Sequence, residues 1–183
     1  QAFTVSAFYK KLMNPIEQIG VASNSVSSFT FSGNNNADVA GVELEFRKNF
    51  DFMNKISRWK QWENFSININ AAYIYSRIQI KDSNAVGNKV RPLQGQTPYV
   101  VNVGLQYNEP KTDITANILF NMVGPKIFAT GNLYDDDLYE NGRPVLDLQL
   151  SKSFFKKRFL VRFTASDLLA QNTVRYFNAP KEK

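Results

Sequence analysis

Residues Phe65 to Tyr75 read Phe-Ser-Ile-Asn-Ile-Asn-Ala-Ala-Tyr-Ile-Tyr. The odd-numbered positions are all apolar or aromatic, and the even-numbered positions are mostly polar or small. Successive side chains of a β-strand point to opposite faces of the sheet. The stretch therefore predicts a strand with one apolar and one polar face.

The same alternation recurs in six further segments. Including its neighbours, the first stretch spans 64–76, and the others are 3–13, 38–48, 97–107, 112–122, 143–153 and 157–167. Strands of soluble proteins average about 5–6 residues, whereas a tilted strand needs about 9–11 residues to cross a bilayer. The seven segments have 11 residues each, except for one of 13. Their length favours strands that cross a membrane.

The connections between these segments alternate in length. They hold 24, 15, 20, 4, 20, 3 and 16 residues, at 14–37, 49–63, 77–96, 108–111, 123–142, 154–156 and 168–183. An up-and-down barrel of the outer membrane has short periplasmic turns and long external loops. We therefore predict an all-β fold: antiparallel up-and-down transmembrane β-barrel strands, about seven long strands of a larger barrel.

In such a barrel the apolar face meets lipid and the polar face lines the lumen. The predicted lumen-lining residues are Glu43, Glu45, Arg47, Asn68, Asn70, Asn102, Gln106, Asn117, Asp147, Gln149 and Arg162. We expect Arg47 to pair with one of the two neighbouring glutamates rather than to leave them for acid–base chemistry. The predicted lipid-interface aromatics are Tyr9, Tyr73, Tyr75, Tyr99, Tyr107, Phe120 and Phe159.

Composition narrows the function. The 183 residues include no His and no Cys, which excludes imidazole catalysis, thiolate nucleophiles and the usual zinc ligands. We expect a non-enzyme without a cofactor. The net charge is +6 (22 − 16), but no nucleic-acid-binding motif accompanies it, so we expect no nucleic-acid partner. The acidic run Asp135-Asp136-Asp137 with Glu140 lacks the spacing of a calcium loop, and we expect no metal there.

Several stretches resemble the TonB-dependent receptors of the Bacteroidetes type. The most specific is Arg91-Pro92-Leu93-Gln94-Gly95-Gln96-Thr97-Pro98-Tyr99. The others are Phe8-Tyr9-Lys10 with Asn14-Pro15-Ile16, then 36–45, 101–105, 139–148 and 167–172. By itself, the Arg91–Tyr99 stretch predicts only a rigid lead-in to a strand, because each proline holds its predecessor extended.

The resemblance implies a large barrel in the outer membrane of a Gram-negative bacterium, with about twenty-two strands and a plugged lumen. Residues 1–183 would be a C-terminal portion of that barrel, without its plug domain and final strand. The implied partners are outer-membrane lipid, the rest of the receptor including its plug, and the TonB complex. A surface lipoprotein lid is a further implied partner.

We expect the chain to form wall strands and extracellular loops of an importer of an unidentified nutrient. The loop residues expected to contact ligand are Phe128, Tyr134, Asp136 and Tyr139. Three alternatives remain open from the sequence. These are a scaffold subunit of an outer-membrane complex without transport, a small complete eight-stranded barrel that uses 172–177 as its last strand, and a soluble β-sandwich.

Overall fold

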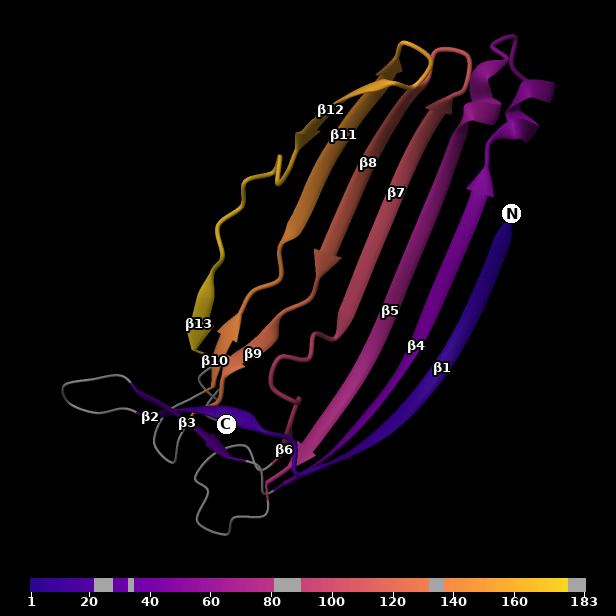
Figure 1. Cartoon of the computed structure of the whole chain (residues 1–183). Helices are drawn as coiled ribbons and strands as arrows, with labels where there is room; N and C mark the ends of the chain where they lie inside the picture. Colours follow the sequence, from indigo (N-terminus) through magenta and orange to yellow (C-terminus); the bar gives the residue numbers. More distant parts are fainter. Residues whose placement is uncertain (22–27, 33–34, 81–89, 132–136, 178–183) are drawn as a thin grey trace.

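The computed structural model describes residues 1–21, 28–32, 35–80, 90–131 and 137–177. Its main sheet follows the chain as an antiparallel meander, in the order β1-β4-β5-β7-β8-β11-β12 (Figure 1). These strands are β1 (Ala2–Met13), β4 (Asn36–Asn49), β5 (Phe65–Gln79), β7 (Tyr99–Glu109), β8 (Ile114–Val123), β11 (Pro144–Phe154) and β12 (Phe159–Ala165). The short β6 (Val90–Arg91) pairs with β5. All seven predicted long segments contribute a strand to this sheet, so the predicted all-β antiparallel fold is confirmed.

The connections form smaller elements, of which the sequence suggested only a strand at 172–177, as part of one alternative. The first carries a hairpin of β2 (Glu17–Val21) and β3 (Ser28–Ser32). A three-stranded sheet joins β9 (Lys126–Ala129), β10 (Leu138–Glu140) and β13 (Arg175–Phe177). Two 3₁₀ helices, η1 (Asp51–Lys55) and η2 (Gln61–Asn64), occupy the connection between β4 and β5. No helix in the described ranges is long and apolar enough to cross a membrane.

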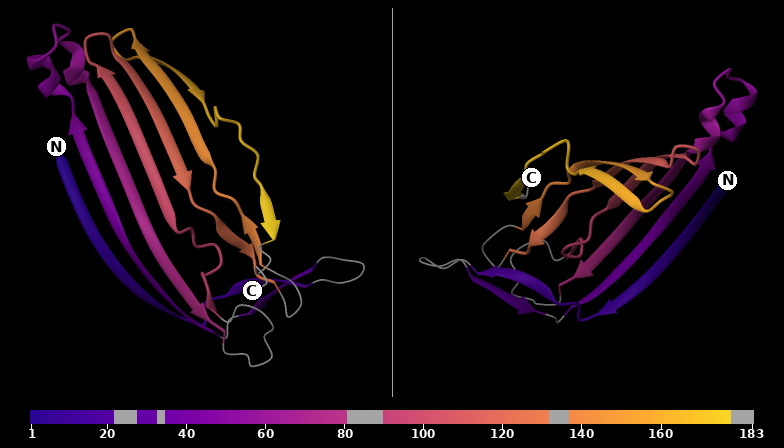
Figure 2. Two further views of the ribbon diagram at one scale, coloured as in Figure 1. Left: turned by 180° about the vertical axis from the view of Figure 1, so that it is seen from behind. Right: turned by 45° about the horizontal axis from the view of Figure 1, so that its top comes forward.

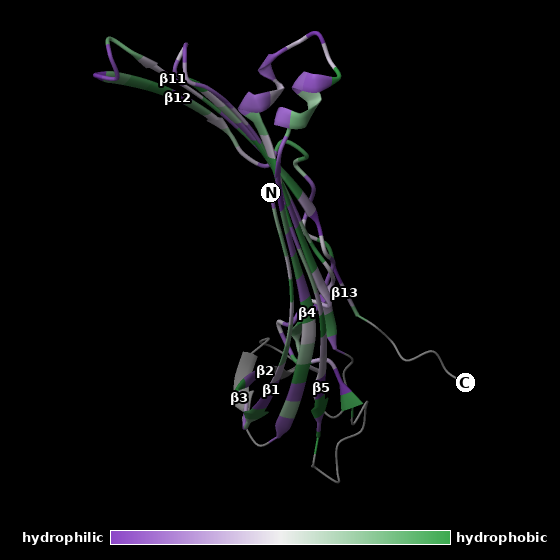
Figure 3. Ribbon diagram, turned by 90° about the vertical axis from the view of Figure 1, so that its right-hand side faces the viewer, coloured by the Kyte–Doolittle hydropathy of each residue, from purple (hydrophilic) through white to green (hydrophobic). Residues whose placement is uncertain are grey.

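The two ends of the main sheet differ. The turns after β7 and β11 lie at the end that carries η1 and η2, which we call the short-turn end (Figure 1). The β2–β3 hairpin and the sheet of β9, β10 and β13 lie at the opposite end, the long-loop end, as the left view of Figure 2 also shows. Seen edge-on in Figure 3, the main sheet is one curved layer in which hydrophilic and hydrophobic residues alternate along the strands.

The main sheet is open. Within the described residues, β1 and β12 are its edges and do not pair with each other. Residues 175–177 do form a strand, but they pair with β10 instead of β1. The eight-stranded closed barrel is therefore wrong for these residues, and they do not form a two-layered sandwich either.

Strand β12 is shorter than the predicted segment 157–167. At its start, Phe155, Lys156 and Lys157 all have positive φ and make the turn from β11. At its end, Asp167 also has positive φ, 53°, which takes the chain out of the extended conformation. The Asp167 amide donates a hydrogen bond to the Asp147 side chain instead of to a strand partner.

Candidate functional site

The strand register collects the predicted apolar positions onto one face, the apolar face. Leu44 lies opposite Val5 of β1 and Ala71 of β5, and Ala71 lies opposite Val101 of β7. The same register continues to the last strand, where Leu150 of β11 lies opposite Phe163 of β12. All seven predicted interface aromatics share this face: Tyr9, Tyr73, Tyr75, Tyr99, Tyr107, Phe120 and Phe159.

On the apolar face, charged side chains lie only near the two ends of the sheet. Lys11, Asp38 and Arg77 are register partners at the long-loop end. At the short-turn end the charged positions are Lys48, Glu109 and Lys152. The ten residue steps from Asp38 to Lys48 span about 34 Å along the strand, or about 26 Å at a barrel-like tilt of about 40°. That height matches the apolar band of about 25 Å that outer-membrane barrels present to lipid.

The other face, the polar face, carries every predicted lumen-lining residue. They are Glu43, Glu45, Arg47, Asn68, Asn70, Asn102, Gln106, Asn117, Asp147, Gln149 and Arg162. Side-chain amides bridge neighbouring strands on this face: Asn121 Nδ2 donates to Asn102 Oδ1 at 2.6 Å, and Asn117 Nδ2 donates to Gln149 Oε1 at 3.4 Å. Arg47 pairs with Glu45 at 3.1 Å, as predicted.

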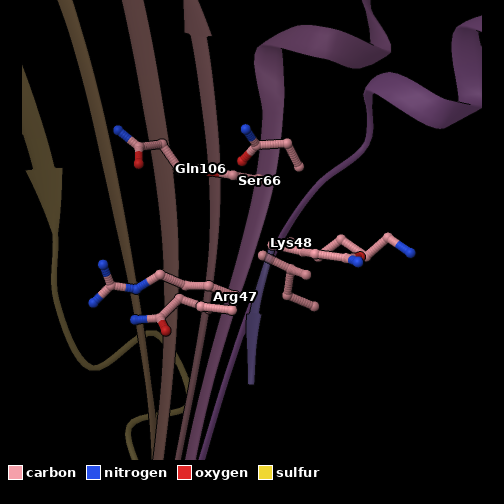
Figure 4. Close-up of a pocket in the computed structure, with 9 residues that line it drawn as sticks. Arg47, Lys48, Ser66 and Gln106 are labelled. Carbon is pink, nitrogen blue, oxygen red and sulfur yellow. The ribbon is translucent and has the colours of Figure 1, made fainter. Parts of the chain in front are cut away.

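A hollow of about 410 Å³ lies toward the short-turn end of β4, β5 and β7. Arg47, Ser66 and Gln106 are among its lining residues. Figure 4 shows Arg47 and Gln106 extending to one side of the sheet and Lys48 to the other, as strand alternation requires. The hollow has polar side chains but no arrangement of a nucleophile with an acid or base.

At the long-loop end, a buried ion pair joins the first connection to the Arg91–Tyr99 stretch. Arg91 Nη1 and Nη2 donate to the two carboxylate oxygens of Glu17 at 2.9 and 2.8 Å. Both side chains are almost fully buried, with 8% and 5% exposed. The Gln94 amide N–H also donates to Glu17, at 3.2 Å.

Gln94 extends this network to a third connection. Its side-chain amide donates to the Gln18 carbonyl at 3.1 Å and to the Phe128 carbonyl at 2.7 Å, and it accepts from the Gln18 amide. Thr130 donates to the same Gln18 carbonyl. We call Glu17, Gln18, Arg91, Gln94 and Thr130 the loop clasp. Sequence reasoning missed this role, because the only signal is a set of polar residues in a segment stiffened by proline, and the bonded partners lie more than 70 residues apart.

The loop clasp covers the polar face of the main sheet. The Leu93 amide donates to the Ser76 hydroxyl, and Ser76 belongs to the polar face. The buried apolar side chains Ala37, Val39 and Ile78 share that face and end of the sheet. The connections thus fold inward over the polar face, and most of the buried core of the described residues lies beneath them.

Strands β9, β10 and β13 form a small sheet with aromatic side chains on both faces, the loop platform. Arg175 stacks over the Phe128 ring at 3.6 Å, and Tyr139 stacks on Tyr176 at 5.8 Å. Phe128 and Tyr139, two of the four predicted ligand residues, thus lie in one small sheet, each stacked with a residue that sequence reasoning missed. The register places them on opposite faces of that sheet, Phe128 with Arg175 and Tyr139 with Tyr176. The other two, Tyr134 and Asp136, lie outside the described residues.

Glu140 is the charged centre of the loop platform. It pairs with Arg175 at 3.0 Å and with Lys126 at 3.3 Å. Burial alone would raise the pKa of the Glu140 carboxyl, but the hydrogen bonds and attraction of Arg175 and Lys126 outweigh burial and hold the pKa below its usual value. Both oxygens of this carboxylate are thus paired with cationic side chains, an arrangement that favours a structural role for Glu140.

The arrangement is that of a membrane β-barrel wall. The family of TonB-dependent receptor-like β-barrels matches residues 1–168, and the chain belongs to this family. Searches of the curated proteins and of the solved structures find no match. The chain is therefore part of an outer-membrane barrel of a Gram-negative bacterium, in a family of transporters and receptors that work with TonB and a plug domain.

Proposed function

We propose that this chain forms the C-terminal part of the wall of a TonB-dependent importer of a nutrient. The polar face lines the lumen, the aromatics of the apolar face lie at the membrane interfaces, and the long-loop end faces outside. A plug supplied by the rest of the receptor fills the lumen and contacts TonB. The observation that carries this proposal is the strand register. It gives the seven strands a charge-free band of membrane height on one face, and amide and charged side chains on the opposite face.

The loop platform is the proposed ligand contact. Gln94 of the loop clasp bonds the Phe128 carbonyl in β9, and β9 pairs with β10, which carries Tyr139. Hydrogen bonds of the backbone therefore hold both rings in place. A preorganised aromatic surface loses less conformational entropy when a ligand binds.

Uptake by the full receptor tests the ligand contact. We expect Phe128→Ala to weaken ligand binding and slow uptake, because it removes a ring of the loop platform. Phe155→Ala is the matched control, since Phe155 is highly exposed at the short-turn end. Equal uptake by both variants and the wild type would refute the ligand role of Phe128. Deleting 123–142 is a blunter test, because it also removes the Phe128 carbonyl that accepts a hydrogen bond from Gln94.

A further inference from the structure

The connection between β4 and β5 does not fit the short turns around it. The other two connections at the short-turn end were predicted with 4 and 3 residues, whereas this one was predicted with 15. In the structure it folds into η1 and η2 and projects beyond the end of the sheet (Figure 1). A barrel wall has no need of such a structure merely to reverse the chain direction.

The projection is built on aromatic rings. Trp59 packs edge-on against Trp62 at 5.0 Å, and both lie within 6 Å of Phe65. Phe65 in turn lies 4.7 Å from Tyr107. We call the aromatic residues Phe50, Phe52, Trp59, Trp62, Phe65 and Tyr107 the rim cluster.

The rim cluster continues the apolar face. Phe65 and Tyr107 are register partners on that face, at its short-turn edge. Beyond them, Trp59 is 45% exposed and the neighbouring Ile56 is 79% exposed. Through Trp59, which contacts Phe65, apolar surface thus continues past the last strand residues on the side of the apolar face.

The segment that carries most of these rings is also rich in cations. Lys48, on the apolar face, lies 4.4 Å from the centre of the Phe52 ring. Lys55, Arg58 and Lys60 are exposed along the projection. Segment 48–63 carries four cations against the carboxylates Asp51 and Glu63, a net charge of +2 (4 − 2). Amphipathic tryptophans with flanking lysine and arginine suit the headgroup zone of a bilayer, where cations attract anionic lipids.

We propose that the rim cluster and its cations bind the headgroups of anionic phospholipids in the leaflet at the short-turn end. Trp59 and Ile56 enter the boundary between headgroups and acyl chains, and Lys55, Arg58 and Lys60 contact the lipid phosphates. Under the proposed function this leaflet is the periplasmic one, and the identity of the leaflet rests on that orientation. Charge complementarity and continuity with the apolar face both favour lipid over a protein occupant.

Phosphatidylglycerol binding to the full receptor tests the site. The receptor is placed in phosphatidylcholine nanodiscs with increasing phosphatidylglycerol, and retained lipid is counted by native mass spectrometry. Each cation near the membrane surface raises the affinity for anionic lipid severalfold. We therefore expect the triple variant Lys55→Gln, Arg58→Gln, Lys60→Gln to lower the phosphatidylglycerol preference by about tenfold or more. Glutamine keeps a hydrogen-bond donor at position 60, where Lys60 bonds the Asn54 carbonyl.

The matched control removes the same charge at the other end of the sheet. In the triple variant Lys10→Gln, Lys11→Gln, Arg77→Gln, the phosphatidylglycerol preference should stay within about twofold of wild type. An equal loss in both variants would mean that only net charge matters. An unchanged preference in the first variant would overturn the lipid site directly.

Two further measurements separate this proposal from the proposed function. Phosphatidylglycerol brominated near its headgroup should quench tryptophan emission more in the wild type than in Trp59→Phe, and equal quenching would overturn the insertion of Trp59. A cysteine placed by Lys55→Cys should resist an impermeant maleimide in intact cells, and the segment has no cysteine of its own. Labelling from outside would overturn the proposed orientation. It would not bear on lipid binding, which the phosphatidylglycerol measurement tests separately.

Discussion

Two arginine–glutamate pairs in this chain share chemistry but differ in burial. The Glu17–Arg91 pair is nearly fully buried, whereas Arg47 and Glu45 are 64% and 44% exposed. An exposed pair is screened by water and contributes about 0–1 kcal/mol. Removing one partner of a buried pair leaves an uncompensated charge and costs about 3–5 kcal/mol.

We therefore expect Arg91→Ala to lower the free energy of local unfolding at the long-loop end of the receptor by about 3 kcal/mol or more. Amide hydrogen exchange should speed up at 90–96 and at 126–130, the segments that the loop clasp joins. Arg47→Ala is the control and should leave exchange in both segments unchanged. If Arg91→Ala exchanges like the control, the loop clasp does not hold the connections together.

Glu140 gives the loop platform a dependence on pH. Its folded pKa is lowered from 4.5, so its ion pairs stabilise the folded state above that pH. The contribution is lost as the pH falls through the lowered value, because over that range the unfolded chain takes up a proton that the folded one does not yet bind.

The expected result is a difference between the wild type and Glu140→Gln that depends on pH. Near neutral pH the full receptor should unfold at a higher temperature than Glu140→Gln, and in acid below the lowered folded pKa the two midpoints should converge. The protonated carboxyl then resembles the amide. A difference that persists unchanged into acid would show that the charge of Glu140 contributes nothing to stability.

At the scale of elements, the long strands were predictable and the short ones were not. Each of the seven main strands contributes to one apolar and one polar face, so its sequence alternates over many residues, as in Phe65 to Tyr75. Strands β10 and β13 have three residues each, too few for a period to be recognised. Their partners are also distant in the chain, since Glu140 lies opposite Arg175.

The same reason explains which site residues were found. Face membership follows from alternation, so all eleven polar-face residues and all seven aromatics lie on the expected faces. The loop clasp and the Arg175–Phe128 stack depend on how separate connections meet in space, which periodicity does not encode. The predicted roles in the lumen and at the lipid interface remain predictions.

The junction of β10 and β11 contains a glycine that other residues cannot replace without moving the backbone. A Cβ at Gly142 would lie 2.0 Å from the Val123 carbonyl oxygen, at the end of β8. We expect Gly142→Ala to destabilise the receptor by about 1–3 kcal/mol, as overpacking does, and to disturb the loop platform. Gly104→Ala is the milder control, because its Cβ would lie 3.3 Å from the Leu119 side chain. Equal unfolding midpoints for the two variants would contradict this expectation.

At the scale of the whole molecule, the described sheet is a wall with two faces and two open edges. One face has a charge-free band of membrane height, and the other is polar and partly covered by the loop clasp. The backbone groups along the outer edges of β1 and β12 have no strand partner among the described residues. Unpaired backbone groups cost several kcal/mol each inside a bilayer, so membrane sheets close into barrels. We therefore expect further strands of the same receptor to pair with both edges.

Heat-modifiable migration on gels tests whether this wall depends on the rest of its barrel. A closed barrel resists detergent and migrates as a compact species until it is boiled, because no strand edge is open to attack. We expect the full receptor to show this shift and residues 1–183 alone to lack it, since detergent or a second copy would occupy the edges of β1 and β12. The isolated chain should also form mixed oligomers through these edges. A compact, heat-modifiable monomer of residues 1–183 would contradict the open wall, and would mean that this chain closes on itself by a pairing of β1 that the present register lacks.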